Sequence, residues 1–178
     1  ANDMVVDGYR FYAFPSVTSI HFYGNAGNDR FINNTTIDSV AYGGAGLDVL
    51  WVGSGNDELY GELGDDIIFG WGGDDLLAGG AGNDRLYGGT GNDLLLSSIG
   101  HDMINGGSGI DEMVGRVSGN AYLVNNTLYT ISPGVFSEGS LKGIETVSLY
   151  GNANDNMIMV QGFKGNVNLH GNSGNDTL

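Results

Sequence analysis

Aspartate residues recur at a fixed nine-residue interval through the middle of the sequence. Eight follow one another without a slip: Asp48, Asp57, Asp66, Asp75, Asp84, Asp93, Asp102 and Asp111. Carboxylate oxygens are hard ligands, so a regular row of them suits a hard cation such as Ca²⁺, which takes about six to eight oxygens. Zinc prefers Cys or His, but the sequence has no Cys and its three His residues stand at unrelated positions. The pattern therefore indicates a cation held by oxygen ligands.

Glycine and aliphatic residues keep the same interval. A Gly stands two positions before each of the eight Asp residues and a large apolar residue two positions after, which gives the repeat GGxGxDxUx. The six Gly-rich positions predict a turn, because Gly tolerates φ > 0 and loses the most entropy in regular structure. The last three positions predict a short strand in which only position eight faces inward. Such a thin core is sufficient only when the strands stack into a solenoid.

The repeat closely resembles the RTX (repeats-in-toxin) calcium-binding nonapeptide family. Eight contiguous copies, from Gly43 to Val114, carry the resemblance. It implies an all-β, right-handed parallel β-roll, a β-solenoid in which two nonapeptides form one coil, here with β-hairpins or irregular coils at the ends. The alternative is that each Asp only caps its own turn, as in an Asx turn, but turn capping does not require a nine-residue period.

The resemblance also implies where calcium binds. Alternate turns stack on one side of the roll, and each ion lies between two stacked turns, held by both Asp carboxylates. Carbonyls of positions two and four come from one turn, and carbonyls of positions one and three from the other. The Asp pairs are 48 with 66, 57 with 75, 66 with 84, 75 with 93, 84 with 102 and 93 with 111. The implied carbonyls are those of Gly44, Gly46, Gly53, Gly55, Gly61, Leu63, Gly64, Gly70, Gly72, Gly73, Gly79, Gly80, Ala81, Gly82, Gly88, Gly89, Thr90, Gly91, Gly106 and Ser108. About six Ca²⁺ ions would offset most of the formal net charge of -15.

Degenerate copies extend the pattern at both ends. Gly24 to Ile32 reads GNAGNDRFI, and Asp38 and Val40 then keep the rhythm without the glycines. The segments from Val17 and from Ile144 resemble each other, which indicates a duplication. Further candidate ligands are therefore Asp29, Asp38, Asp155 and Asp176. Inside the array, Glu62, Trp71 and the pair Ser97–Ser98 replace repeat glycines, and we expect weaker sites there if the turn needs φ > 0.

Three segments follow from this reading. Residues 1–42 are expected to form a hairpin, with an Asp7–Gly8 turn, and degenerate entry coils. Residues 43–114 are the β-roll core of eight nonapeptides. Residues 115–178 are expected to contain a second hairpin, with a turn at Asn125–Asn126, and to begin a second repeat array.

The outward positions seven and nine carry rows of apolar residues. Such rows usually mark a contact surface. Either the hairpins and the 117–150 segment fold over them, or copies of the chain pack against each other there. One row holds Val49, Trp51, Ile67, Phe69, Arg85, Tyr87, Met103 and Asn105; the other holds Glu58, Tyr60, Leu76, Ala78, Leu94, Leu96, Glu112 and Val114.

Composition excludes several functions. Six basic against 21 acidic residues exclude a nucleic-acid binder and disfavour contact with anionic membranes. No apolar stretch reaches the about 18 residues that a membrane-spanning helix needs. There is no nucleophile elbow, HExxH motif or phosphate loop, so we predict no enzyme and name no catalytic residues.

The sequence therefore predicts a calcium-binding, structural β-roll module that folds on Ca²⁺ binding. The resemblance implies a secreted bacterial protein, extracellular or at the cell surface: an adhesin, a surface-layer or filament protein, or a type I-secreted protein. One alternative is a self-assembling filament or surface-layer subunit, in which copies continue the roll head to tail, since both ends of the sequence lie inside a repeat. The other is the C-terminal accessory region of a secreted hydrolase or epimerase.

Overall fold

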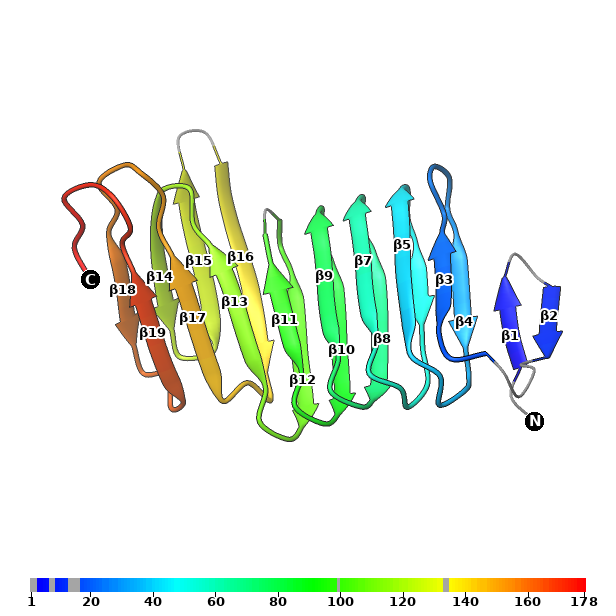
Figure 1. The fold of residues 1–178 in the computed structure, drawn as a ribbon. Coiled ribbons are helices and arrows are strands. Elements are labelled where there is room, and N and C mark those ends of the chain that lie inside the picture. Colours follow the sequence, from blue (N-terminus) through cyan, green and yellow to red (C-terminus); the bar gives the residue numbers. More distant parts are fainter. Residues whose placement is uncertain (1–2, 7–8, 13–16, 99, 133–134) are drawn as a thin grey trace.

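The protein is a β-solenoid of two sheets that lie face to face along one axis (Figure 1). The computed structural model describes residues 3–6, 9–12, 17–98, 100–132 and 135–178, and every regular element in these ranges is a strand. Within the array the chain crosses from one sheet to the other after every nonapeptide, so that neighbouring strands of a sheet are parallel. The predicted all-β roll is confirmed.

One sheet has eleven strands and the other has eight. In spatial order the larger sheet contains β18 (Ile158–Gln161), β14 (Asn120–Val124), β15 (Thr127–Ser132), β16 (Val135–Lys142), β12 (Met103–Ser108), β10 (Arg85–Thr90), β8 (Ile67–Gly72), β6 (Val49–Trp51), β4 (Arg30–Asn33), β1 (Asp3–Val6) and β2 (Tyr9–Tyr12). The smaller sheet contains β19 (Asn166–His170), β17 (Thr146–Tyr150), β13 (Glu112–Arg116), β11 (Leu94–Ser97), β9 (Leu76–Ala81), β7 (Glu58–Leu63), β5 (Ser39–Ala45) and β3 (Ile20–Tyr23).

Most strands of the array are longer than the three residues predicted from the repeat. Strand β10, for example, runs on from position nine into the first three positions of the next repeat, where Gly89 pairs with Trp71 and Thr90 with Gly72. The reason is that main-chain N–H and C=O groups between closely stacked coils need partners, and the adjacent coil supplies them. The Gly-rich half of each repeat therefore takes part in the sheet as well as in the turn.

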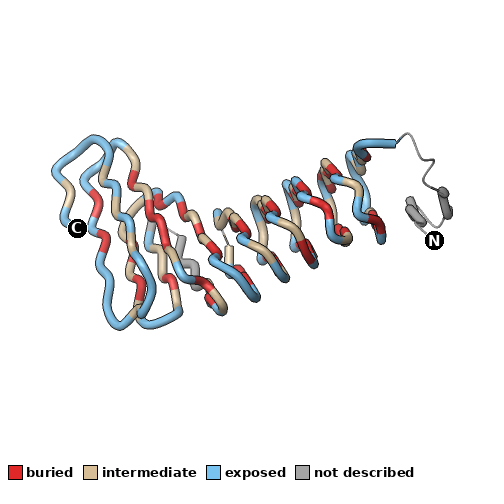
Figure 2. The backbone as a smooth tube through the Cα atoms, turned by 60° about the horizontal axis from the view of Figure 1, so that its bottom comes forward, coloured by how far each residue is buried: buried red, intermediate tan, exposed pale blue. Residues whose placement is uncertain are grey.

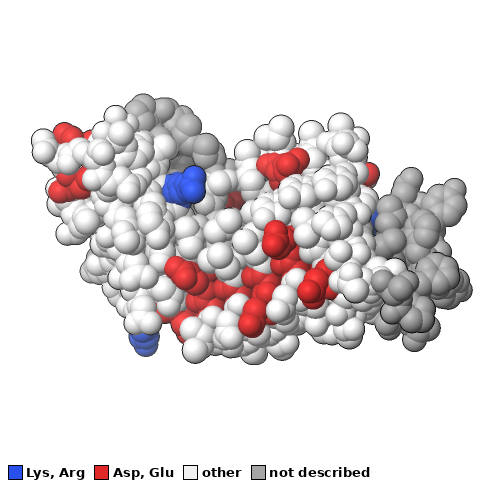
Figure 3. Space-filling model, viewed as in Figure 1, with Lys and Arg blue, Asp and Glu red and all other residues white. Residues whose placement is uncertain are grey.

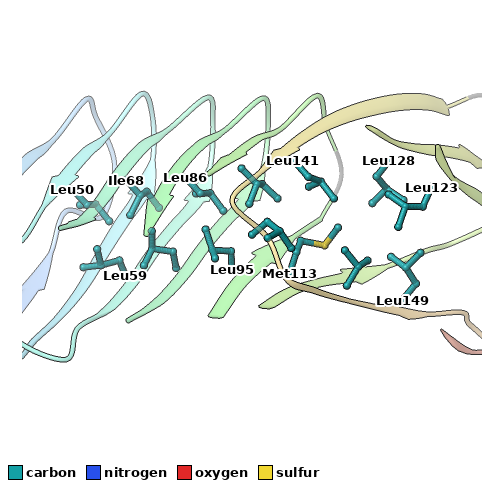
Figure 4. Close-up of a cluster of buried hydrophobic side chains, with 14 of the residues drawn as sticks. Leu50, Leu59, Ile68, Leu86, Leu95, Met113, Leu123, Leu128, Leu141 and Leu149 are labelled. Carbon is teal, nitrogen blue, oxygen red and sulfur yellow. The ribbon is translucent and has the colours of Figure 1, made fainter. Parts of the chain in front are cut away.

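The eighth position of each repeat forms the core. Seven of the eight side chains are fully buried, and Ile104 is 3 % exposed. Figure 4 shows labelled members of the two facing rows, with Leu50, Ile68 and Leu86 on one sheet and Leu59 and Leu95 on the other. Buried residues recur in every coil along the roll (Figure 2). This inward assignment follows from the alternation of side chains along a strand.

Both hairpin regions belong to the larger sheet, one at its edge and the other within it. Strand β1 pairs antiparallel with β2 and with β4, while the Asp7–Gly8 turn lies outside the described residues. Strands β14, β15 and β16 form an antiparallel unit between β12 and β18, with Asn125 and Asn126 in the turn between β14 and β15. No counterpart of this unit lies in the smaller sheet, where β13 pairs directly with β17. The hairpin strands thus add to the sheet edge to edge and do not lie over the outward apolar rows.

Aromatic side chains on the outer faces instead stack on one another and so cover part of each other's apolar surface. Tyr23, Tyr42 and Tyr60 form one stack on the smaller sheet, with ring centroids 5.3 Å and 4.9 Å apart. Trp51, Phe69 and Tyr87 follow one another on the larger sheet at 4.9 Å and 4.7 Å. These distances match the spacing of neighbouring strands, about 4.8 Å. The ring faces are therefore directed along the roll and contact each other.

We expect Leu77→Ala to lower the free energy of unfolding by about 2–5 kcal/mol, because it leaves a cavity in a thin core. Leu77 is fully buried, whereas its neighbour Leu76 is half-buried on the outer face. The matched control Leu76→Ala should cost about 0.5 kcal/mol or less. Urea unfolding in saturating calcium measures both, and equal losses would contradict the inward assignment of position eight.

Candidate metal centre

Aspartate side chains form two ladders, one along each edge of the roll. The main-chain N–H of each Asp donates to Oδ1 of the Asp one coil further on. All six predicted pairs are joined in this way, at 2.8 Å for 48–66 and 57–75, 2.9 Å for 66–84 and 93–111, 3.0 Å for 75–93 and 3.1 Å for 84–102. Asp29 also belongs to a ladder, because its N–H donates to Asp48 Oδ1 at 2.7 Å.

The second carboxylate oxygen of most ladder residues is buried without a partner. From Asp48 to Asp111 the ladder side chains are at most 3 % exposed. Oδ2 accepts no hydrogen bond in Asp29, Asp48, Asp57, Asp66, Asp75, Asp84, Asp93 and Asp111. A buried carboxylate with an unpartnered oxygen is costly unless a cation or a proton neutralises it. These oxygens mark the positions where the roll lacks a positive charge.

Position one is glycine in six of the eight turns of the array, where this oxygen packs against the glycine backbone. A Cβ added to Gly61, Gly79 or Gly106 would lie 2.3, 2.2 or 2.5 Å from Oδ2 of the Asp in the same turn. At these three positions a side chain would require the carboxylate to move. The glycine therefore lets the carboxylate lie against the main chain of its own turn.

Main-chain carbonyls line the gap between stacked turns. The carbonyls of positions two and four point to the next coil: a Cβ on Gly80 would lie 2.1 Å from Glu62 O, and a Cβ on Gly91 would lie 2.0 Å from Gly73 O. Those of positions one and three point back, since a Cβ on Gly61 would lie 2.5 Å from Gly79 O, and Leu63 O accepts the Gly46 N–H at 2.9 Å. These four carbonyls stand at the repeat positions that the resemblance implied, and their role as ligands stays a prediction.

This donor set fits calcium. Within the described part of the chain, no group of three or more His, Cys, Asp and Glu side chains comes together. A cation between two turns would therefore take most of its ligands from carbonyl oxygens, with two carboxylates to offset its charge. Ca²⁺ accepts such mixed oxygen ligands in flexible geometry. Figure 3 shows the acidic side chains gathered in a band along one edge of the roll.

Burial disfavours the charged form of the ladder carboxylates. Together with a smaller contribution from neighbouring ladder carboxylates, it raises the pKa of Asp75 to about 8 and the pKa of Asp84 to about 7. For the same main reason, the pKa values of Asp57, Asp66 and Asp93 rise to about 6. Hydrogen bonds from the stacked turn oppose the shift without cancelling it. A bound cation would therefore stabilise the charged form of these carboxylates near neutral pH.

Comparison with protein families agrees with this geometry. A family model, the RTX calcium-binding nonapeptide repeat (4 copies), matches residues 42–77, 78–113 and 150–178, more than half of the chain. The chain belongs to the RTX calcium-binding repeat family. Its roll is therefore a calcium-binding module of the RTX type. No curated protein matches the sequence.

In the degenerate RTX copies, the residue that occupies the sixth position of the repeat, where the ladder Asp stands in the regular copies, is not the expected one. Ser39 donates its N–H to Asp57 Oδ1, while Asp38 stands one position earlier and accepts the Asn56 N–H at 2.9 Å. Ala41, two residues after Ser39, is accordingly the buried core residue, and Val40 faces outward. One inserted residue thus moves the expected Asp38 and Val40 out of register.

The C-terminal copy shows the same displacement. Asn156 donates its N–H to Asp176 Oδ1 at 2.9 Å, which places Asp176 at a ladder position. Asp155 is exposed and accepts the Asn175 N–H, as a fifth-position residue does. The neutral Asn156 side chain accepts the Asn152 N–H and donates to Gly119 O, so it brings no charge to this turn.

Sequence reasoning missed Glu145. Its Oε2 accepts the Asp111 N–H at 3.0 Å, which is the role of Oδ1 in the regular ladder, and Thr146 after it pairs with Glu112. The carboxylate of Glu145 adds to the burial that raises the Asp111 pKa. The signal was present, because Glu145 precedes the buried Val147 by two residues, as Asp does in the repeat.

The second position of the repeat has φ > 0 in six of the eight repeats, two of which have no glycine there. Glu62 has φ 78° and Trp71 has φ 66°, like Gly80 at 97° in the coil next to Glu62. A residue with a Cβ is strained in this region. The condition for weaker calcium sites at these two positions is therefore met, and the weaker binding itself stays a prediction.

We predict that Glu62→Gly raises the free energy of unfolding by roughly 0.5–1 kcal/mol in saturating calcium, because it removes this strain. Leu63, the next residue, is 60 % exposed and outside the left-handed region, so Leu63→Gly should not stabilise the protein. Thermal and urea unfolding measure both. A destabilised Glu62→Gly variant would contradict the strain argument.

In chelator, the stability of the folded form should fall as pH rises. The ladder carboxyls have raised pKa values in the folded state and an unfolded value near 3.8, so the folded state binds more protons between about pH 4 and pH 8. Their contribution is complete below about pH 4 and is lost as pH rises through the folded pKa values. Urea midpoints in chelator from pH 4 to 8 test this. Midpoints that increase with pH would show that the ladders are not buried as described.

Proposed function

We propose that this chain is a structural module that folds when calcium binds between its stacked turns. The observation that supports it is the row of buried, unpartnered Oδ2 atoms, each beside a gap lined by carbonyl oxygens. Six stacked pairs have an unpartnered Oδ2 on both members: 29–48, 48–66, 66–84, 57–75, 75–93 and 93–111. We therefore propose about six Ca²⁺ ions in the roll.

Calcium supplies the positive charge that offsets the paired carboxylates. The Asp side chains and the carbonyls of two turns hold the ion, and the ion joins two coils that otherwise repel each other. Binding to the folded state alone shifts the folding equilibrium by mass action. Calcium sites of extracellular modules commonly have Kd values of about 0.1–1 mM. A chain with such sites stays expanded in a compartment poor in calcium and folds after export.

An extracellular or cell-surface role follows from this linkage. We propose that the module belongs to a secreted bacterial protein, as part of an adhesin, a surface-layer or filament protein, or a type I-secreted protein. Within the described residues, no helix is suited to cross a membrane. The RTX repeat is a structural calcium-binding unit, and we propose that this chain contributes structure and not catalysis.

Self-assembly is a second candidate. The last coil exposes Met159 at 52 % and Leu178 at 58 %, and β19 pairs with β17 on one side only. Such an edge of parallel strands can accept a further coil, either from the same polypeptide or from a second copy. Growth in particle size on calcium addition would support assembly between copies.

Calcium titration of chelated protein tests the proposed function. Far-UV circular dichroism should change from coil to β, while static light scattering reports whether the particle grows. Magnesium at the same concentration is the control, since it prefers rigid octahedral sites and keeps its water. A spectrum that stays unchanged at about 10 mM calcium, ten times the upper end of this Kd range, would overturn the proposal.

Asp75→Asn should weaken calcium-induced folding, because Asp75 stands in two stacked pairs. We expect the calcium midpoint to rise by about tenfold or more, which corresponds to about 1.4 kcal/mol. Asp74→Asn is the matched control: Asp74 is exposed, and its Oδ1, which the amide retains, accepts the Asn92 N–H. Equal midpoints for the two variants would argue against a role of the ladder in binding.

A further inference from the structure

The turn before Asp102 differs from every other turn of the array in its first two positions. Ser97 and Ser98 stand where the consensus repeat has a glycine pair. Position one is glycine in six of the eight array turns, and Val52 is the other exception. The serine turn is the one that carries hydroxyl groups at both positions.

These hydroxyls bond the groups that would otherwise face an ion. Ser97 Oγ donates to Asp102 Oδ2 at 2.9 Å, and the Ser98 N–H also donates to the Asp102 carboxylate. Ser98 Oγ donates to Gly80 O, a second-position carbonyl that points into the gap between the Asp84 and Asp102 turns. With the Asp84 N–H on Oδ1, both oxygens of Asp102 have donors.

Asp102 is accordingly the exception among the eight array Asp residues. The other seven have a buried Oδ2 without a partner, and Asp102 does not, although it is only 3 % exposed. The ladder that contains Asp102 also ends there. Met103 pairs with Ser140, whose N–H donates to Asp102 O, so the residue stacked on Asp102 in the next coil is Gly139, which has no carboxylate. An ion at this gap would have to compete with hydrogen bonds that already satisfy the carboxylate.

We propose that the gap between the Asp84 and Asp102 turns is closed by serine hydroxyls and holds no calcium. The proposal rests on the proposed function of the other gaps. The serine turn ends one calcium ladder at the point where the larger sheet takes up β16. It joins two coils by hydrogen bonds that need no metal, so this edge of the roll stays closed there when calcium is absent.

Counting bound calcium by native mass spectrometry tests this directly. We expect Ser97→Gly/Ser98→Gly to bind one Ca²⁺ more than the parent, because glycine frees Asp102 Oδ2 and Gly80 O and restores the consensus turn. Ser54→Gly is the control, since it makes the same exchange at position three of another turn, where Ser54 is exposed, and its count should equal that of the parent. Equal counts for the double variant and the parent would overturn the proposal, as would the loss of an ion, which would make the serines ligands.

A second comparison does not depend on a remodelled turn. Asp102→Asn should leave the calcium count of the parent unchanged, since the amide oxygen at the Oδ1 position still accepts the Asp84 N–H and the Ser97 hydroxyl can accept from the amide NH2. Asp84→Asn should remove at least one ion, because Asp84 Oδ2 is unpartnered and Asp84 is stacked on Asp66. Loss of an ion in Asp102→Asn would overturn the proposal while leaving the proposed function intact. A parent that binds no calcium would overturn both.

Discussion

The roll depends on how buried carboxylates are neutralised. Nine-residue repeats bring Asp side chains into register along two edges, and strand spacing holds them about 5 Å apart. Each uses Oδ1 to join two coils, while Oδ2 stays buried without a partner in most turns. The same contact therefore both binds the coils together and creates the charge that separates them. A cation resolves this conflict, and this explains why a fold with one core aliphatic residue per repeat can depend on a metal.

Glycine makes the arrangement possible at two levels. At position one it leaves room for the carboxylate, and at position four it lets the carbonyl of one coil approach the next: a Cβ on Gly64 would lie 1.6 Å from Gly46 O. Substitutions within the array show what each position tolerates. Glu62 accepts a strained backbone, whereas Ser97 replaces the approach of the ion with hydrogen bonds. The departures from the repeat thus carry as much information as the repeat itself.

Sequence alone predicted the regular part of the fold because one period specifies turn, strand and core together. The inward residues and the stacking of alternate Asp residues follow from it, whereas the direction of the carbonyls came from the resemblance to the RTX family. The period could not predict the unit of β14, β15 and β16, since these strands contain no repeat and pair with neighbours far along the chain. Nor could it place Ser39 and Asn156, where a single inserted or deleted residue changes which side chain enters the ladder. Glu145 was overlooked because it is a Glu where the repeat has Asp, and because the segment before it lacks the glycine pattern of the repeat.

The central claim is that calcium lies between stacked turns, beside the unpartnered carboxylate oxygens. Anomalous X-ray diffraction from crystals grown in calcium tests it most directly, because it locates each ion independently of the protein phases. The account predicts two rows of anomalous peaks along the edges of the roll, each peak between Asp residues one coil apart, such as Asp75 and Asp93. Peaks confined to exposed acidic residues such as Asp65 or Asp74, with none between the turns, would contradict it.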